Sequence, residues 1–440
     1  MVMNVLIYSQ YWQKGGIEKV IEYLTSGLAD DYNFSILTED VPDPENQFEF
    51  SNQTKIYYRL FSPFNEFHRI SMRKFIIDID PDVIIVMGAN RALYKASRAV
   101  VGLDYPVIIS EHQPHKQLLR KLYNDDRFLT AIRDLADYNH VIFPQFIETY
   151  YNQDKVKAIP NPIIPLTNRA NMGSKKIVNI ARYDLDQKQQ DVLVRAFALL
   201  SGKYPDWTLD LYGGDWFGGQ QNIKDLVSKL NMTDRINVYD ATDDVGSVLE
   251  TASIFAFPSA YEAFGLVVGE AFSVGLPVVG FANCDGVNQL IRNESNGILV
   301  DSNVRDYRAF SVGLDMLMNS QELREQYSCS ALSSIKAYSM DIFLTDWKKL
   351  IDCASQIKGK NRLKNLSDME LGYINYVASG YFFDVLNKRQ IHITTFKRKL
   401  ISLLRKLGLE KTARSIYRKI KSGKQGLKKT ARYVYQKLKP

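Results

Sequence analysis

The sequence of 440 residues lacks the features that mark membrane-spanning and secreted proteins. It contains no apolar stretch of about eighteen residues, the length that a helix needs to cross a bilayer. No basic leader precedes the first apolar segment, so we expect no secretory signal. The three cysteines, Cys284, Cys329 and Cys353, have no metal-ligand spacing and form no even-numbered framework, and we expect reduced packing residues. These absences predict a cytoplasmic protein.

The net charge changes sign along the chain, and the end of the chain is strongly basic. Residues 388–440 hold eighteen Lys or Arg residues against one acid, Glu410, which is a local net charge of +17. Since the whole chain carries +7, residues 1–387 carry −10. Such an asymmetry indicates a tail that meets a polyanion, either nucleic acid or an anionic membrane surface.

Apolar, β-rich runs alternate with longer segments of helical periodicity, which is typical of parallel sheets with crossover helices. Two prolines flank Asn161 in the segment 159–163 and predict an extended connection between domains. Only helical periodicity is found from residue 301 to 357. The strands expected before the connection are 4–8, 33–37, 83–87, 107–110 and 140–143, and those expected after it are 176–181, 208–212, 236–239, 254–257 and 277–280.

The fold class that follows is α/β, with two doubly wound Rossmann-like domains facing a cleft and a basic α-helical tail. We place the first domain at residues 1–160, the second at 161–357 and the tail at 358–440. Doubly wound sheets bind ligands at the carboxyl ends of their strands, so the cleft is the expected site.

Two short segments could contact phosphate groups. Gly15 and Gly16 lie between the first strand and the first helix, where the backbone can approach a ligand and the helix start offers free N–H groups, although such turns are also ordinary loop chemistry. Arg182 and Lys188 follow the first strand of the second domain. Two cations there could neutralise a diphosphate, and the alternative is a pair of solvated surface charges.

Two glutamates, Glu262 and Glu270, lie eight residues apart around a strand-to-helix turn and form the sharpest pattern in the chain. An acid at the amino end of a helix complements the helix dipole, which explains Glu262 in part. Glu270 stays unexplained, because an acid inside an apolar helix is costly unless it is bound to something. The two carboxylates could accept hydrogen bonds from sugar hydroxyls.

A histidine, His112, follows the strand 107–110 and is expected to face the cleft. Its pKa suits it to polar exchange with a reacting hydroxyl. Lone histidines are mostly structural, and only its position distinguishes His112 from His68, His140 and His392.

Taken together, these segments resemble glycosyltransferase family 4, whose members carry a Gly-Gly loop near the start, an Arg and Lys pair after the linker and a Glu-x7-Glu motif. The resemblance covers most of residues 1–350. It implies a retaining hexosyltransferase of the GT-B architecture that takes a nucleotide sugar as substrate and uses no cofactor and no metal. Glu262-Ala-Phe-Gly265 through Glu270 has the spacing and the Phe-Gly of the family.

The resemblance also implies roles for single residues. Glu270 would bind the ribose, Glu262 would lie beside the donor sugar, Arg182 and Lys188 would hold the diphosphate, and His112 would lie near the reacting centre. The catalytic set is then His112, Glu262, Arg182 and Lys188, and the donor-binding set is Gly15, Gly16, Arg182, Lys188, Glu262, Phe264, Gly265, Leu266 and Glu270, in which the glycine loop and residues 264–266 contribute backbone N–H groups. Asn161, in the family-like Pro-Asn linker, is regarded as structural.

Two departures from the family pattern are present. Gln189 stands where the family often has glycine, so the local loop geometry is expected to differ. The glycine-rich turn after the next strand is extended by Trp216-Phe-Gly-Gly219, to which we assign no role.

The tail alternates apolar and basic residues at helical spacing, which predicts amphipathic helices that bind anionic lipid. A membrane-linked glycan or teichoic-type polymer is then the expected acceptor, and the inner face of the cell membrane is the expected location. The Ser-Glu-His and Pro-Asn-Pro segments resemble family members that use UDP-linked sugars, so a UDP-linked hexose or N-acetylhexosamine is the favoured donor. We expect no nucleic-acid binding, since the body is acidic; the chain could form a homo- or hetero-oligomer. The residues expected at the membrane are Lys397, Arg398, Lys399, Arg405, Lys406, Arg418 and Lys419.

Two alternatives share the two-lobed fold. The chain could be a catalytically silent subunit that positions an acceptor or a partner transferase, but a silent copy has no reason to keep Arg182, Lys188, Glu262 and Glu270 together. It could instead be a sugar-nucleotide epimerase or a sugar-phosphate synthase, which would need no membrane tail.

Overall fold

The computed structural model describes residues 2–358, except 11, 13–14, 40–47, 49, 51–53, 60–65, 89–94, 97–98, 101–102, 122–128, 131–132 and 135. The predicted tail helices, with all seven residues expected at the membrane, lie outside the described residues. Within the described ranges, no helix has both the length and the hydropathy of a membrane span.

The first part of the chain forms a seven-stranded parallel sheet of order β3-β2-β1-β4-β5-β6-β7. All five residues of β4 are buried, which is expected where helices cover both faces of a parallel sheet. The elements are β1 (Met3–Ser9), α1 (Gly16–Gly27), β2 (Tyr32–Thr38), β3 (Lys55–Tyr58), α2 (Glu66–Ile79), β4 (Val83–Met87), β5 (Val107–Glu111), α4 (His115–Lys121), β6 (Tyr138–Val141), the 3-10 helices η2 (Pro144–Thr149) and η3 (Gln153–Lys155), and β7 (Val156–Ala158).

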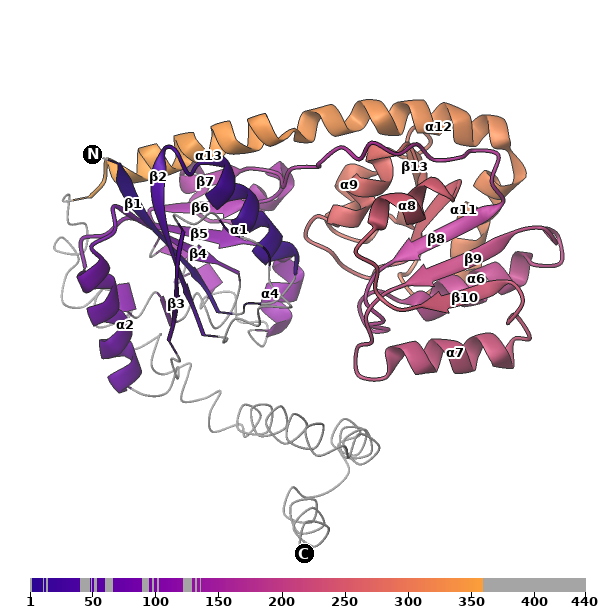
Figure 1. Cartoon of the computed structure of the whole chain (residues 1–440), viewed down its shortest axis with the longest axis horizontal. Coiled ribbons are helices and arrows are strands. Elements are labelled where there is room, and N and C mark those ends of the chain that lie inside the picture. Colours follow the sequence, from indigo (N-terminus) through magenta and orange to yellow (C-terminus); the bar gives the residue numbers. More distant parts are fainter. Residues whose placement is uncertain are drawn as a thin grey trace, which may run out of the picture. The chain divides into compact units, whose positions relative to one another are not determined.

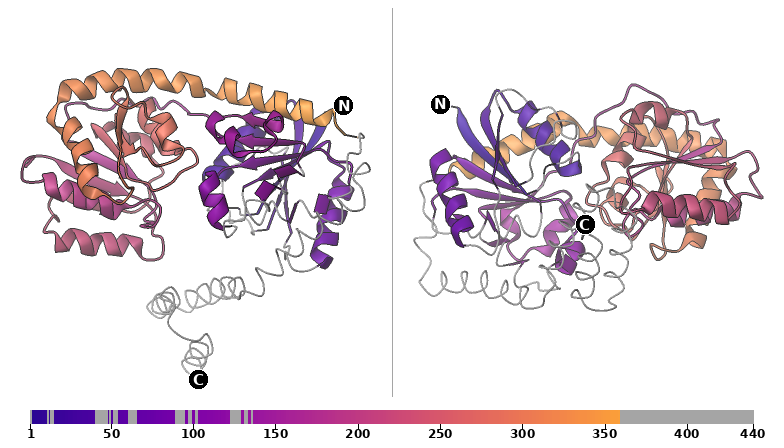
Figure 2. Two further views of the ribbon diagram at one scale, coloured as in Figure 1. Left: turned by 180° about the vertical axis from the view of Figure 1, so that it is seen from behind. Right: turned by 60° about the horizontal axis from the view of Figure 1, so that its bottom comes forward.

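The second part forms a six-stranded parallel sheet of order β10-β9-β8-β11-β12-β13. Its central strand β11 is again buried throughout, and helices flank both sheets in Figures 1 and 2. The elements are β8 (Lys176–Ile180), α6 (Gln190–Leu200), β9 (Thr208–Tyr212), α7 (Gly219–Lys229), β10 (Ile236–Tyr239), α8 (Val245–Glu250), β11 (Ile254–Phe257), α9 (Leu266–Ser273), β12 (Val278–Phe281), α10 (Val287–Leu290), β13 (Gly297–Val300), α11 (Tyr307–Asn319), α12 (Gln321–Ser334), η4 (Ile335–Tyr338) and α13 (Met340–Ser355).

The ten strands expected from the sequence are all present, with bounds that differ by at most two residues. Three further strands, β3, β7 and β13, were not expected. Each lies at an edge of its sheet and is only three or four residues long. An edge strand is covered on fewer sides, so its sequence lacks the long apolar run by which central strands are found.

The last helix in the described part of the chain, α13, packs against the first sheet although it follows the second in sequence. It begins after Ser339, whose side chain accepts a hydrogen bond from the Ile342 N–H at 3.4 Å. Tyr32 at the start of β2 donates to the Asp352 carboxylate at 2.6 Å. Figure 1 shows α13 reaching the first sheet. Its apolar face joins the core of β1, β2 and β4 through Phe343, Trp347, Leu350, Ile351 and Ala354.

The cysteines differ in part from expectation. Cys284 is buried in the core of the second sheet, as a packing residue should be. Cys329 and Cys353 are exposed, so the prediction is wrong for these two. They lie on α12 and α13, on faces that no neighbouring element covers among the described residues.

Candidate active site

The loop after β8 carries Arg182 at the carboxyl edge of the second sheet. The Arg182 side chain is 46% exposed. Its Nη2 atom donates to Gln187 Oε1 at 2.8 Å and to Asp184 Oδ2 at 3.4 Å. The guanidinium also lies over the Trp216 ring, 4.7 Å from its centroid. These contacts hold the cation in one place while leaving much of its surface open to an anion.

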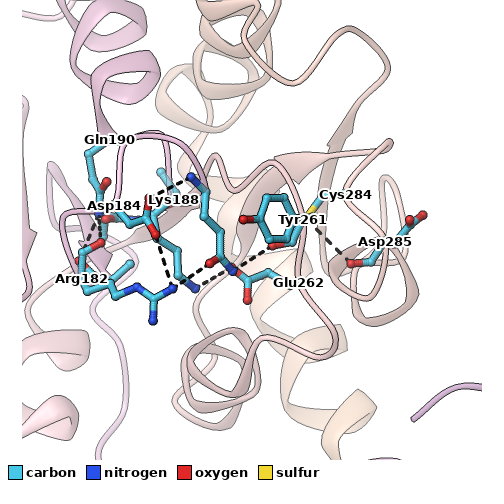
Figure 3. Close-up of polar contacts among 12 residues, drawn as sticks. Arg182, Asp184, Lys188, Gln190, Tyr261, Glu262, Cys284 and Asp285 are labelled. Carbon is cyan, nitrogen blue, oxygen red and sulfur yellow. Dashed lines mark hydrogen bonds and ion pairs between the residues drawn. The ribbon is translucent and has the colours of Figure 1, made fainter. Parts of the chain in front are cut away.

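Lys188 and Glu262 form an ion pair between the loops that follow β8 and β11. Lys188 Nζ donates to Glu262 Oε1 at 2.5 Å, and the two side chains are only 15% and 10% exposed (Figure 3). Because β8 and β11 are neighbours in the sheet, their carboxyl ends bring residues 74 positions apart into contact. Each charge is costly to bury alone, so the pair holds both groups at this edge.

Gln187 is a site residue that the sequence did not reveal. Its Oε1 accepts from Arg182, while its Nε2 donates to the Tyr261 carbonyl at 3.2 Å and lies 3.5 Å from Glu262 Oε1. An amide can serve both partners at once because it has an acceptor on one side and donors on the other. In the sequence, only its position between Arg182 and Lys188 could have indicated that Gln187 belongs to the site.

Gln189 adopts the left-handed backbone conformation that glycine favours, with φ of 52°. The loop therefore has a glycine-like backbone here despite the missing glycine. A left-handed non-glycine residue costs about 1–2 kcal/mol. The side chain is 1% exposed, and with its amide nitrogen as donor it reaches the Pro258 carbonyl at 3.3 Å and the Val304 carbonyl. These contacts offset the backbone cost.

The start of α9 combines packing with an open backbone. Gly265 precedes the helix with φ of 84°, a conformation that strains other residues. The Phe264 side chain is 2% exposed and stacks on Phe143, with 5.4 Å between ring centroids. Phe264 therefore packs the core through its ring, and only its backbone could serve a donor. Leu266 begins the helix, whose first N–H groups favour an anion.

The glycine loop before α1 lies beside α9. A Cβ atom on Gly16 would lie 3.8 Å from Leu266 Cδ1. Burial raises the pKa of Glu270 above its usual range, and the nearby charge of Lys19 on α1 partly offsets that rise. The structure thus brings Gly16, Leu266 and Glu270 into one region, and the partly buried acid inside α9 has a cationic neighbour.

His112 follows β5 in the first sheet and is 7% exposed. Its Nε2 atom lies 2.9 Å from Ser110 Oγ. Burial, with a smaller contribution from His140, lowers the pKa of His112 to about 3, so the ring is neutral at physiological pH. The hydrogen bonds of the described residues join His112 to Ser110 and not to Glu262, so its part in the reaction stays a prediction.

The Trp216–Gly219 insertion exposes its two aromatic residues, Trp216 and Phe217, and is supported by Asp215. The Asp215 carboxylate accepts from the backbone N–H groups of Gly218 and Gln220, both at 3.0 Å. Trp216 is 44% exposed and contacts Arg182 as described above. The insertion therefore lies next to Arg182, which is predicted to bind the diphosphate.

Acidic residues near this edge are already engaged. Asp184 and Asp186 have the spacing of an Asp-x-Asp pair, but Asp184 contacts Arg182 and the N–H groups of 186 and 187, and Asp186 lies 3.6 Å from Arg305. Among the residues that the structure describes, no group of three or more His, Cys, Asp or Glu side chains could hold a metal ion. The absence of a metal requirement stays a prediction.

Comparisons with known proteins show which family the second part of the chain matches. Residues 163–332 match the model of the glycosyl transferases group 1. An uncharacterised glycosyltransferase of Haemophilus influenzae is 27% identical over 77% of this chain and 96% of that protein. An α-1,4-N-acetyl-D-galactosaminyltransferase of Campylobacter jejuni, named for an undecaprenol-linked GalNAc acceptor, is 22% identical over 77% of this chain and 95% of that protein.

The fold agrees with solved structures. HepE of Anabaena, solved in complex with UDP and glucose, superposes with a TM-score of 0.66 at 16% identity, over 80% of this chain and 99% of that one. The chain spans only 34% of an exopolysaccharide phosphotransferase of Streptomyces coelicolor and 38% of a D-inositol 3-phosphate glycosyltransferase of Salinispora tropica. Residues 163–332 thus carry a domain of the glycosyl transferases group 1, and with its two parallel Rossmann-like sheets the chain is a retaining glycosyltransferase of the GT-B fold.

Proposed function

We propose that the protein transfers a hexose or N-acetylhexosamine from a UDP-linked donor to a membrane-linked glycan or teichoic-type polymer. The observation that carries the donor site is the buried Lys188–Glu262 pair beside the half-exposed Arg182. A cation held in a mostly buried pair and a second cation with free surface together suit the two phosphates of a nucleoside diphosphate. The favoured nucleoside is uridine because the similar HepE is described in complex with UDP.

The main task of the site would be to stabilise the negative charge that develops on the leaving diphosphate. Arg182, Lys188 and the amino end of α9 would stabilise it without an added metal ion. Glu262 would accept a hydrogen bond from a hydroxyl of the donor sugar, and Glu270 would accept hydrogen bonds from the ribose hydroxyls. The acceptor oxygen would bond to the anomeric carbon on the face from which the diphosphate leaves, and its proton would pass to the departing diphosphate oxygen, so the configuration is retained.

The proposed acceptor follows from the basic tail and from a relative. The Campylobacter protein is named for a glycan on undecaprenol diphosphate, which is a membrane lipid. Residues 388–440, with a net charge of +17, would hold the enzyme on an anionic surface where such an acceptor lies. The protein would then be peripheral at the cytoplasmic face of the membrane.

A thermal-shift screen tests the donor site. Purified protein is heated with UDP, GDP, ADP or their sugars, without added metal. A ligand at about a hundred times its Kd should stabilise the fold by about 2.7 kcal/mol. We expect a shift with UDP and UDP-sugars. Loss of one charged hydrogen bond in Arg182→Ala, Lys188→Met or Glu270→Ala should weaken UDP binding about ten- to a hundred-fold.

Lys203→Met is the matched control. Lys203 also forms an ion pair, with Asp315 at 2.7 Å, but it is 55% exposed and lies outside the proposed site. Its loss should leave the UDP shift unchanged. A shift with none of the nucleotides would instead favour a silent subunit, and a shift that survives all three site substitutions would place the nucleotide elsewhere.

A further inference from the structure

A chain of hydrogen bonds connects His112 to the linker through two neighbouring strands. Ser110 on β5 stands opposite His140 on β6 in the register of the sheet. Ser110 Oγ lies 2.9 Å from His112 Nε2 and 2.8 Å from His140 Nδ1. His140 Nε2 lies 2.8 Å from the carbonyl oxygen of Ile159. Ser110 and His140 are fully buried, so water cannot replace a missing partner.

The Ile159 carbonyl cannot donate a hydrogen bond, and this fixes which group donates in each bond of the chain. The Ile159 carbonyl only accepts, so His140 Nε2 must carry a proton. In a neutral imidazole the other nitrogen is then an acceptor, which means that the Ser110 hydroxyl donates to His140 Nδ1. The Ser110 hydroxyl has one proton, which it donates to His140. It must therefore accept a hydrogen bond from His112, so His112 Nε2 also carries a hydrogen.

Burial keeps both rings neutral, as this assignment requires. Burial lowers the pKa of His140 to about 4, although its bond to the Ile159 carbonyl acts in the opposite direction. The adjacent acid, Glu111, does not compensate a charge on either ring, because it is paired with Arg133 through bonds of 2.7 and 2.8 Å. Trp347 of α13 packs on the His140 ring at 4.7 Å between centroids and holds it from the other side.

We propose that Ser110 and His140 are positioning residues that hold His112 in the Nε2–H tautomer, so that Nδ1 is a fixed acceptor for a hydroxyl group of a bound sugar. Ser110 is the only hydrogen-bond partner of the His112 ring in the described part of the chain, and the ring keeps 7% of its surface exposed. The contact with sugar rests on the proposed function, whereas the tautomer does not.

Nitrogen-15 NMR of the full-length protein, labelled in its five histidines, tests the proposal. Long-range proton–nitrogen correlations distinguish the two tautomers and the imidazolium. Each signal is assigned by substituting one histidine at a time. At neutral pH we expect the Nε2–H form for both His112 and His140. A His112 ring in the Nδ1–H form, or a protonated one, would overturn the proposal.

Two variants test the coupling between the rings. His140→Phe keeps an aromatic ring against Trp347 but removes the acceptor of the Ser110 hydroxyl, which can then either donate to His112 Nε2 or accept from it, so His112 should become a mixture of tautomers. Ser110→Ala should have the same effect, and both should lower kcat for UDP-sugar turnover about ten-fold, as expected for one misdirected hydrogen bond, with little change in the KM for the donor. An unchanged His112 tautomer in both variants contradicts the relay.

The outcomes separate this inference from the proposed function. If the tautomers are as expected but His112→Ala keeps full activity, the relay stands and the contact with sugar is wrong. If the protein binds UDP but His112 has the other tautomer, the donor site stands and the relay is wrong. Thermal unfolding of each variant, compared with wild type, shows whether the fold is intact.

Discussion

Two buried imidazoles make the stability of the fold depend on pH. In the unfolded chain His112 and His140 take up protons below about pH 6.5. In the folded chain their pKa values are lowered to about 3 and about 4. Between these limits the unfolded state binds more protons, so stability is fully present above about pH 6.5 and is lost as the pH falls towards 4.

Chemical denaturation at about pH 7.5 and about pH 5 measures this effect. The His140 contribution alone should amount to about 2 kcal/mol over that interval. His140→Phe should therefore show a smaller loss of unfolding free energy on acidification than wild type by about that amount. An equal loss in both proteins would mean that His140 is not held neutral in the fold.

At the scale of elements, α13 serves as part of the core of the first sheet. Trp347 is fully buried and packs with β1, β2 and β4 residues and with His140. Replacing a buried tryptophan with alanine removes apolar contact and leaves a cavity, which costs about 3–5 kcal/mol. Trp347→Ala should lower the unfolding free energy by that amount.

The matched control lies on the same helix. Ile342 is 45% exposed, so Ile342→Ala should change the unfolding free energy by less than about 0.5 kcal/mol. Denaturant titration of both variants gives the comparison. Similar effects at the two positions would show that α13 is not docked through its apolar face.

At the scale of the whole molecule, the basic tail should act independently of the folded body. Residues Met1–Ala378 and Ser379–Pro440 are separate units. A cation near an anionic membrane contributes about 1 kcal/mol, so eighteen of them can hold the protein on a vesicle. Truncation after Ala378 should abolish sedimentation with phosphatidylglycerol vesicles and leave the UDP thermal shift unchanged.

A full-length variant separates charge from length. Replacing the seven predicted membrane residues, Lys397, Arg398, Lys399, Arg405, Lys406, Arg418 and Lys419, with glutamine should weaken vesicle binding, and added salt should do the same in wild type. Binding to neutral and anionic vesicles alike would contradict an electrostatic tail. Binding to nucleic acid in place of vesicles would assign the tail to the other polyanion.

The sequence by itself determined the α/β class, the ten main strands and the order of the motifs, because each of these rests on periodicity or spacing between near neighbours in the chain. Gly15, Gly16, Arg182, Lys188, Glu262 and Glu270 could be selected for the same reason. The glycine-like backbone of Gln189 and the bridge made by Gln187 could not, since both depend on groups supplied by other loops.

Only the tertiary structure decided which distant residues meet. The Lys188–Glu262 pair requires β8 and β11 to be neighbours, and the Ser110–His140 contact requires the register of β5 with β6. The return of α13 to the first sheet depends on the packing of its apolar face against β1, β2 and β4, which lie far earlier in the chain. Pairing across such separations is set by strand order and packing, which no local pattern in the sequence records.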